Sequence, residues 1–464
     1  MSGLPWIWRS TAAAICCLLV ACSSVRPWQN PVAKDAPSPG PAPAAAAGPV
    51  RDIRDRPIVA VVALSGGGAR AAAFGLGVLR ELKATTFTWA GRTSSLMDQV
   101  GLISGVSGGS ILAAYYAAFG DETFTRFEPD FLLDDFESGL VTASLAPSKL
   151  VDLTSPWYGR SNVLAERLDA LYRGRTYGDL QNRREGPELL VTATDLTTGA
   201  PFEFDAAQFG LICSDLRAVP LSFAVASSSA VPILLTPTTL SNHAGECAHG
   251  AATAQATAGS ARDYRGRLLQ ASAAGYRDAS NRPFIHLVDG GLVDNLGVRG
   301  LLDRVAIEGS IVRSFDGVAP GTVHRLVMIV VNAERDPTER IDRSERVPDT
   351  SQVVNALLFG AGSRGTQATL ALLDDDAERW RRELAGQRGQ PASPFAADAQ
   401  IHVVTVSLRD VEDAARAGAL LHIPTALTIA STDVQRLQAA GREALRRSPA
   451  FQQLVRSLDS GPHR

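Results

Sequence analysis

One serine in this sequence lies in surroundings that favour nucleophilic chemistry. Residues 105–109, Gly-Val-Ser-Gly-Gly, fit the pattern Gly-x-Ser-x-Gly and lie between an apolar stretch at 100–103 and an apolar run at 111–119. The first stretch predicts a buried strand and the second a packed helix. In such a unit the serine is held on a sharp turn at the carboxyl edge of a sheet, beside a helix N-terminus. We therefore expect Ser107 to be a nucleophile; the alternative is a glycine- and serine-rich turn without chemistry.

A second glycine-rich turn precedes the serine motif. The apolar run at 58–64 predicts a buried parallel strand, and Ser-Gly-Gly-Gly-Ala-Arg at 65–70 follows it directly. A phosphate-binding P-loop is disfavoured because the required Lys-Ser or Lys-Thr is missing. A dinucleotide site fits the glycine spacing, but residues 85–95 lack the acidic residue that would bind the ribose. We favour an oxyanion hole, in which consecutive backbone N–H groups converge on one point.

An aspartate follows a later apolar strand. Residues 284–288 predict this strand, and Asp289 is followed by Gly290 and Gly291. An aspartate at the carboxyl end of a strand suits a second catalytic group on the same sheet edge as Ser107. The residues alone favour a simpler alternative, in which Asp289 is a turn residue that caps the next helix.

These turns need a sheet with helices on both faces to position them. Two successive strand–glycine turn–helix units favour a βαβ arrangement with parallel strands. Further buried strands are expected at 189–194, 325–331 and 401–407. We see no internal repeat and no second linker, so residues 57–458 are expected to form one domain, with its core motifs within 58–299. The expected fold is α/β, a three-layer α/β/α sandwich around a mainly parallel central sheet.

The composition narrows the possible partners. Apolar residues make up 45% and charged residues 20% of the 464 residues, as in a globular protein with a sizeable core. A net charge of −3 and the lack of a long basic run argue against a nucleic-acid partner. His243 and His249 flank Cys247, but we expect no metal site there.

The N-terminus has the features of a secretory signal. Arg9 precedes an apolar run at 11–21 that is too short to span a bilayer, and Leu-Val-Ala-Cys at 19–22 resembles the bacterial lipoprotein box. The resemblance implies a signal peptide at 1–21 and a lipid on Cys22. Ser23 is not the aspartate that would favour the inner membrane, so the implied location is the bacterial cell envelope, lipid-anchored at the outer membrane. A plain signal peptide or an apolar N-terminal helix is the alternative.

The segment after the signal and the remaining cysteines carry two further expectations. Residues 22–56 are rich in Pro, Ala and Gly without apolar periodicity, so we expect a lipid-anchored, disordered tether. Cys213 and Cys247 are the cysteines that remain in the domain. An even pair in an oxidising compartment favours a Cys213–Cys247 disulfide, with two buried free thiols as the alternative.

Taken in order, the three motifs resemble the patatin-like phospholipase family. The segments at 226–232 and 289–297 are similar to further blocks of that family. The resemblance implies an α/β/α sandwich and a Ser–Asp dyad without a catalytic histidine, with Ser107 as the nucleophile and Asp289 as the base. It implies an oxyanion element at Gly66, Gly67, Gly68 and Arg70, and supporting motif glycines at Gly105, Gly108, Gly109, Gly290 and Gly291.

The resemblance also predicts a function and leaves two rivals. We expect a serine lipid acyl hydrolase of phospholipase A, lysophospholipase or esterase type, acting through an acyl-enzyme on lipid at a membrane surface, without cofactor or nucleotide. One rival is a Ser–His–Asp esterase, for which His422, in a loop-like stretch, is the candidate histidine. The other is a non-catalytic envelope lipoprotein that binds lipid or a partner protein.

Overall fold

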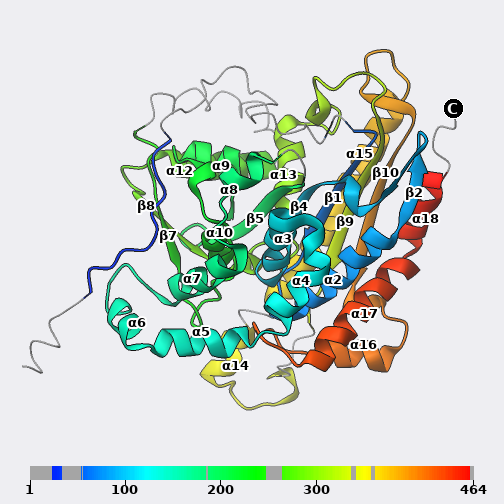
Figure 1. Ribbon diagram of the computed structural model, residues 1–464. Coiled ribbons are helices and arrows are strands. Elements are labelled where there is room, and N and C mark those ends of the chain that lie inside the picture. Colours follow the sequence, from blue (N-terminus) through cyan, green and yellow to red (C-terminus); the bar gives the residue numbers. More distant parts are fainter. Residues whose placement is uncertain are drawn as a thin grey trace, which may run out of the picture.

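A mixed, mainly parallel sheet runs through the centre of the molecule (Figure 1). The structure is a computed structural model, and it describes residues 23–33, 54, 56–183, 186–246, 264–335, 341–356 and 361–459. The sheet strands are β1 (Ile58–Leu64), β4 (Val100–Gly105), β5 (Glu188–Asp195), β6 (Pro201–Glu203), β7 (Thr238–Ser241), β8 (Phe284–Val288), β9 (Val323–Asn332) and β10 (Phe395–Ser407). Their order is β10-β9-β1-β4-β5-β8-β7, with β6 paired to β5.

The parallel part of the sheet carries the predicted motif strands. β10, β9, β1, β4 and β5 pair in parallel, whereas β8 pairs antiparallel with β5 and with β7, and β6 pairs antiparallel with β5. A small hairpin of β2 (Thr86–Trp89) and β3 (Arg92–Ser95) lies outside this sheet. It occupies the stretch where a dinucleotide-binding fold would need its ribose-binding strand.

Helices cover both faces of the sheet, as the alternation along β1 requires. Residues 58, 60, 62 and 64 of β1 join one apolar cluster, and residues 59 and 63 join another on the opposite face. The first cluster includes α2 (Gly68–Ala84), α3 (Gly108–Phe119), α7 (Arg160–Tyr172), α10 (Leu221–Ser228), α17 (Ser431–Arg447) and α18 (Pro449–Asp459). The second includes α13 (Arg299–Glu308) and α15 (Ala361–Gln387). The expected α/β fold with flanking helices is confirmed.

The structure contains further α-helices besides these. They are α4 (Thr123–Phe127), α5 (Phe136–Leu145), α6 (Pro147–Asp152), α8 (Tyr177–Gln181), α9 (Ala206–Leu211), α12 (Tyr264–Arg277), α14 (Thr350–Asn355) and α16 (Ala414–Leu421). α5 and α6 follow one another along the lower edge in Figure 1. None of the helices in the described part of the chain is both long and apolar enough to cross a bilayer.

The segment 23–33 differs from the expected disordered tether, because it packs on the folded body. Trp28 contacts the ring of Phe223 with centroids 4.8 Å apart. The buried Asn30 side chain donates to Ser214 Oγ and to the Ser241 carbonyl oxygen. These two side chains hold a segment whose Pro and Ala content suggested no packing. The rest of the expected tether, except residues 54 and 56, lies outside the described residues, as do the signal peptide and Cys22.

The predicted disulfide is described on one side only. Cys213 is disulfide-bonded and has a positive φ of 52°, which is uncommon for a non-glycine residue. Cys247 lies outside the described residues. The Cys213–Cys247 pairing therefore stays a prediction.

Candidate active site

Ser107 lies on a strained turn between β4 and α3. β4 ends at Gly105 and α3 begins at Gly108, and Ser107 between them has φ 49° and ψ −124°. L-residues avoid positive φ, so this conformation persists only where the surroundings enforce it. At Gly105 an added Cβ would lie 2.6 Å from Ser110 Cα, so no larger residue fits the turn. The sequence motif thus produces the predicted turn, with the buried Ser107 directly before the N-terminus of α3 and lining a pocket.

The serine turn and the first glycine turn touch through their backbones. A Cβ on Gly108 would lie 2.0 Å from the Gly68 carbonyl oxygen, and one on Gly109 would lie 2.4 Å from the Leu64 carbonyl oxygen. Real Cβ atoms do not approach so closely, so only glycine permits this contact. The two motifs, distant in sequence, therefore form one structural unit.

A buried serine of α10 holds the Ser107 backbone in place. Ser107 donates its N–H to Ser228 Oγ (2.9 Å), and Ser228 donates its hydroxyl to the Thr192 carbonyl oxygen (2.6 Å). On the other side, Ser110 Oγ donates to the Ser107 carbonyl oxygen (2.6 Å). The sequence placed Ser228 in a family-like block at 226–232, but its role as a positioning residue was missed.

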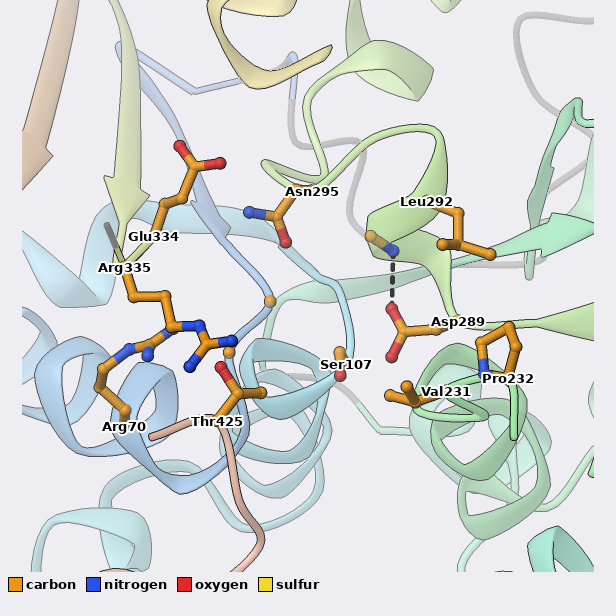
Figure 2. Close-up of a pocket in the computed structure, with 13 residues that line it drawn as sticks. Arg70, Ser107, Val231, Pro232, Asp289, Leu292, Asn295, Glu334, Arg335 and Thr425 are labelled. Atoms are coloured by element: carbon orange, nitrogen blue, oxygen red, sulfur yellow. Dashed lines mark hydrogen bonds between the residues drawn. The ribbon is translucent and has the colours of Figure 1, made fainter. Parts of the chain in front are cut away.

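Asp289 reaches the same pocket, where its backbone is fixed at both ends. Its N–H donates to the Ala230 carbonyl oxygen (3.0 Å), and its own carbonyl oxygen accepts from Thr194 Oγ1 (2.8 Å). Its Oδ1 accepts the N–H of Gly291 (2.7 Å; Figure 2). Asp289 therefore caps the short 3-10 helix Gly290–Leu292, as the simpler alternative expected, and it also lines the pocket.

Burial raises the pKa of Asp289 to about 6, and the hydrogen bonds from Gly291 and Ser107 only partly oppose this rise. Ser107 and Asp289 are both buried and both line one pocket. Figure 2 shows the two side chains on facing sides of a short gap. A carboxyl with this pKa is ionised at neutral pH and is still basic enough to accept a proton.

The direction of β8 differs from the expectation that parallel strands bring Ser107 and Asp289 together. β8 is antiparallel to β5, with Val288 opposite Thr194. β5 extends beyond Val191, which pairs with Gly105 at the end of β4. β8 therefore runs back along this extension, and Asp289 approaches Ser107 from the opposite direction. Gly290 permits the close turn, because a Cβ there would lie 2.2 Å from the Thr192 carbonyl oxygen.

In the first glycine turn, Gly66 and Gly67 line the pocket, whereas Gly68 is not among its lining residues. Gly66 donates its N–H to the Asn295 carbonyl oxygen (2.9 Å), which corrects its expected role in an oxyanion hole. No group in the described part of the chain accepts the N–H of Gly67 or Gly68. These glycines have positive φ values of 139° and 61° at the start of α2, where the first N–H groups of a helix have no partner within it. Asn295, which sequence reasoning missed, also lines the pocket.

Arg70 supports the glycine turn rather than pointing freely into the pocket. It is buried, and it donates from Nε to the Ala333 carbonyl oxygen (3.0 Å) and from Nη1 to the Ile423 carbonyl oxygen (2.7 Å). Burial, and then the nearby charge of Arg335, lower the pKa of Arg70 to about 9, opposed by Glu334. Arg70 thus joins the loops that follow β9 and α16 beside Gly67.

The pocket has an apolar side and a polar side. Val231, Pro232 and Leu292 lie next to Asp289 in Figure 2, whereas Arg70, Glu334, Arg335 and Thr425 lie on the other side of Ser107. Among the described residues no histidine lines this pocket. His422 is exposed at the end of α16, with Nδ1 2.6 Å from the Gly418 carbonyl oxygen. His324 and His402 lie on strands β9 and β10, where they contact Asp398 and Ser457.

Metal-binding side chains do not gather at this pocket. Within the described ranges, no three His, Cys, Asp or Glu side chains form a group that suits a metal ion. His243 bonds instead with Glu246 and with the Asn30 carbonyl oxygen.

The chain was compared with known proteins. Similar solved structures include human GIVD cytosolic phospholipase A2, at 12% identity and a TM-score of 0.45, covering 87% of this chain and 62% of that chain. VipD from Legionella pneumophila aligns at 12% identity and a TM-score of 0.32, covering 86% and 66%. This chain therefore spans about two thirds or less of these proteins' length. No curated protein matches the sequence.

Residues 62–302, more than half of the chain, match the pattern of patatin-like phospholipases. The chain therefore belongs to the patatin-like phospholipase family of carboxylic ester hydrolases.

Proposed function

We propose that the protein is a serine lipid acyl hydrolase whose catalytic groups are Ser107 and Asp289. One observation carries the proposal: a hydroxyl on a strained turn and a buried carboxyl with a pKa of about 6 line the same pocket. A serine hydroxyl is a weak nucleophile until a neighbouring base takes its proton. The position of Asp289 in the pocket and its raised pKa support this role as the base.

The proposed reaction has two stages. Asp289 takes the Ser107 proton while Oγ bonds to the ester carbonyl carbon. The N–H groups of Gly67 and Gly68 donate hydrogen bonds to the carbonyl oxygen as it becomes negatively charged. The bond to the alcohol then breaks, and Asp289 returns the proton to the departing alcohol. Water attacks the acyl-enzyme, gives a proton to Asp289 and releases the carboxylic acid, and the proton passes back to Ser107.

The two sides of the pocket suit a lipid ester. An acyl chain fits beside the apolar Val231, Pro232 and Leu292, and a polar alcohol portion fits beside Thr425 and Arg335. We propose a lipid with both parts, such as a phospholipid, a lysophospholipid or a related ester.

A panel of nitrophenyl esters with increasing acyl length tests this function. Ser107→Ala is expected to lose turnover by about 10⁴-fold, because it removes the nucleophile. His422→Ala serves as the matched control and is expected to stay within about twofold, because that side chain does not line the pocket. Equal losses in both variants would favour the Ser–His–Asp esterase. No Ser107-dependent turnover at any acyl length would favour a non-catalytic lipoprotein.

We further propose that Cys22 carries a lipid that anchors the protein in the bacterial envelope, at the outer membrane. The signal-like residues 1–21 and Leu-Val-Ala-Cys at 19–22 support this location. Mass spectrometry of the mature N-terminus checks it, with a chain that begins at a lipid-modified Cys22 as the expected result. An unmodified N-terminus, or one that begins elsewhere, would remove the anchor from the proposal.

A further inference from the structure

One edge of the molecule exposes large apolar side chains to solvent. We call this surface the apolar rim, and it consists of Leu145 at the end of α5, Leu150 and Val151 on α6, Trp157 after α6, and Ile233 and Leu234 after α10. These side chains are between 48% and 64% exposed. Exposed apolar residues that cluster in this way mark a surface that meets another apolar phase or a partner.

The apolar rim is joined directly to the pocket. Ile233 and Leu234 follow Val231 and Pro232, which line the pocket beside Asp289. Arg160 at the start of α7 donates from Nη2 to the Ile233 carbonyl oxygen (2.7 Å), which links this turn to the segment that carries Trp157. A molecule that lies on the rim is therefore next to the catalytic groups.

The turn at Ile233 is held in a conformation that its residue type disfavours. Ile233 has a φ of 75°, and β-branched residues rarely adopt positive φ. The side chain gains no burial in return, since it is among the most exposed apolar groups of the described chain. Strain of this kind is found where the presented side chain has a function.

The N-terminal segment leaves the folded body at the same rim. Ser23 donates its N–H to Thr154 Oγ1 (3.0 Å), just after α6. Ser155 Oγ donates to the Val25 carbonyl oxygen (2.7 Å), and the Arg26 guanidinium lies 4.0 Å from the centre of the Trp157 ring. Figure 1 shows this dark-blue segment ending close to α6. Cys22 directly precedes Ser23 in the sequence, so a lipid on Cys22 would be attached one residue from this contact.

We infer that the apolar rim docks on the bilayer that holds the protein's own N-terminal anchor. This inference rests on the proposed function for the anchor and for the lipid substrate. Trp157 with Arg26 over its ring is an aromatic and cationic pair of the kind that lies at head-group level. The anchor and the rim fix the orientation of the body together, and a lipid ester passes from the bilayer over Ile233 into the pocket.

Contact of the rim with lipid is tested by site-specific fluorescence. Two variants, Leu150→Cys and Leu268→Cys, are purified from bacterial membranes, and the introduced cysteine of each is labelled with the fluorophore bimane. Each labelled protein is then bound to vesicles of phosphatidylethanolamine and phosphatidylglycerol. Leu268 on α12 is the matched control, because it is 52% exposed and does not belong to the apolar rim. In Figure 1, α12 lies in the upper part of the molecule and α6 in the lower part. Lipid brominated in its acyl chains is expected to quench the label at 150 at least about threefold more than the label at 268. Equal quenching would overturn the inference whether or not the protein is an enzyme.

Activity on two substrates separates docking from catalysis. The double variant Leu150→Ser with Trp157→Ser is expected to hydrolyse vesicle lipid about tenfold more slowly, with a soluble short-chain ester hydrolysed at the wild-type rate. Leu268→Ser with Phe284→Ser is expected to change neither rate. Unchanged vesicle hydrolysis in the rim variant would overturn the inference, as would a rim variant that converts a dimer to a monomer in solution. If wild-type protein hydrolyses neither substrate faster than Ser107→Ala does, the proposed function is contradicted instead.

Discussion

Two non-glycine residues with positive φ differ in their relation to the pocket: Ser107 lines it, and Ile233 directly follows the lining residue Pro232. Ser107 (φ 49°) is buried, whereas Ile233 (φ 75°) is exposed. The Ser107 turn is fixed from several sides, by Ser228, by Ser110 and by glycines that touch neighbouring backbone. The Ile233 carbonyl oxygen is held from α7 by the Arg160 side chain.

The difference indicates two uses of local strain. In the buried turn, many contacts hold one reacting atom in one position, as nucleophilic catalysis requires. In the surface turn, the same kind of backbone displays apolar side chains to the outside. Substitutions at Asp289, Ser228 and Ile233 separate these two uses.

Asp289→Asn is expected to break the chemistry of the buried turn while leaving its geometry intact. Asparagine keeps an oxygen that accepts the Gly291 N–H but cannot take the Ser107 proton. Turnover of a soluble ester is expected to fall by at least about 10³-fold. A variant with more than a tenth of wild-type activity would contradict the role of Asp289 as base.

The same variant is expected to be more stable than wild type at neutral pH. Burial raises the folded-state pKa of Asp289 to about 6, so the ionised carboxylate destabilises the fold at higher pH, and this penalty disappears once the group is protonated in both states. The expected gain in the free energy of unfolding is about 3 kcal/mol near pH 7.5, falling to about zero near pH 3.5. Urea unfolding of both proteins at the two pH values measures it, and an equal gain at both would exclude the titration of Asp289 as its cause.

The pH dependence of wild-type turnover reports on the same carboxyl. Because Asp289 must be ionised to act as a base, kcat/KM is expected to fall about tenfold per pH unit below about pH 6 and to be level above it. The His422→Ala variant is expected to give the same profile. A profile that shifts with that substitution would move the base from Asp289 to a histidine.

Ser228→Ala is expected to loosen the buried turn without removing a reacting group. It leaves the Ser107 N–H and the Thr192 carbonyl oxygen without this partner, and kcat is expected to fall about tenfold with little change in KM. Ser227→Ala is the matched control, since Ser227 Oγ bonds to the Phe223 carbonyl oxygen and to Thr238 and not to Ser107. A positioning role for Ser228 is supported if both variants lose a similar free energy of unfolding but only Ser228→Ala loses kcat. Equal losses of kcat in the two variants would contradict that role.

Ile233→Gly is expected to have the smallest effect, and like Asp289→Asn at neutral pH it is expected to stabilise the fold. Glycine accepts the positive φ, so the free energy of unfolding is expected to rise by about 1 kcal/mol, with the soluble ester still hydrolysed normally. Ile233→Ala removes most of the apolar side chain but keeps the Cβ, and is expected to give no such gain. Thermal unfolding of the three proteins checks this, and equal stabilities of the glycine and alanine variants would show that the backbone is not strained.

Local patterns predicted the turns, whereas contacts between distant segments escaped prediction. Ser107 and the glycines at 66–68 sit in strand–turn–helix patterns that a short stretch of sequence specifies. The bond from Gly66 to Asn295 and the bond from Ser107 to Ser228 join residues far apart in the chain, and no periodicity encodes such pairs. Asp289 followed an apolar strand as expected, but the antiparallel direction of β8 depends on how far β5 extends past β4.

The N-terminal segment was misjudged for a different reason. Its average composition suggests a chain without packing, yet Trp28 and Asn30 are enough to dock residues 23–33. A few specific contacts can therefore order a segment whose composition favours disorder, and a prediction from average composition does not detect such contacts.

The backbone contact between Gly108 and Gly68 has a consequence for substrate selectivity, because the residues that form this contact differ from those that would contact the substrate. The spacing between the Ser107 backbone and the proposed oxyanion donors is set by main-chain atoms, so Ser107 itself is the one residue whose rotamer changes the distance from Oγ to these donors. Val231, Leu292 and Thr425 line the pocket without taking part in that contact. The range of accepted substrates can therefore change through these side chains in evolution or in design, while the reacting distance is inherited unchanged.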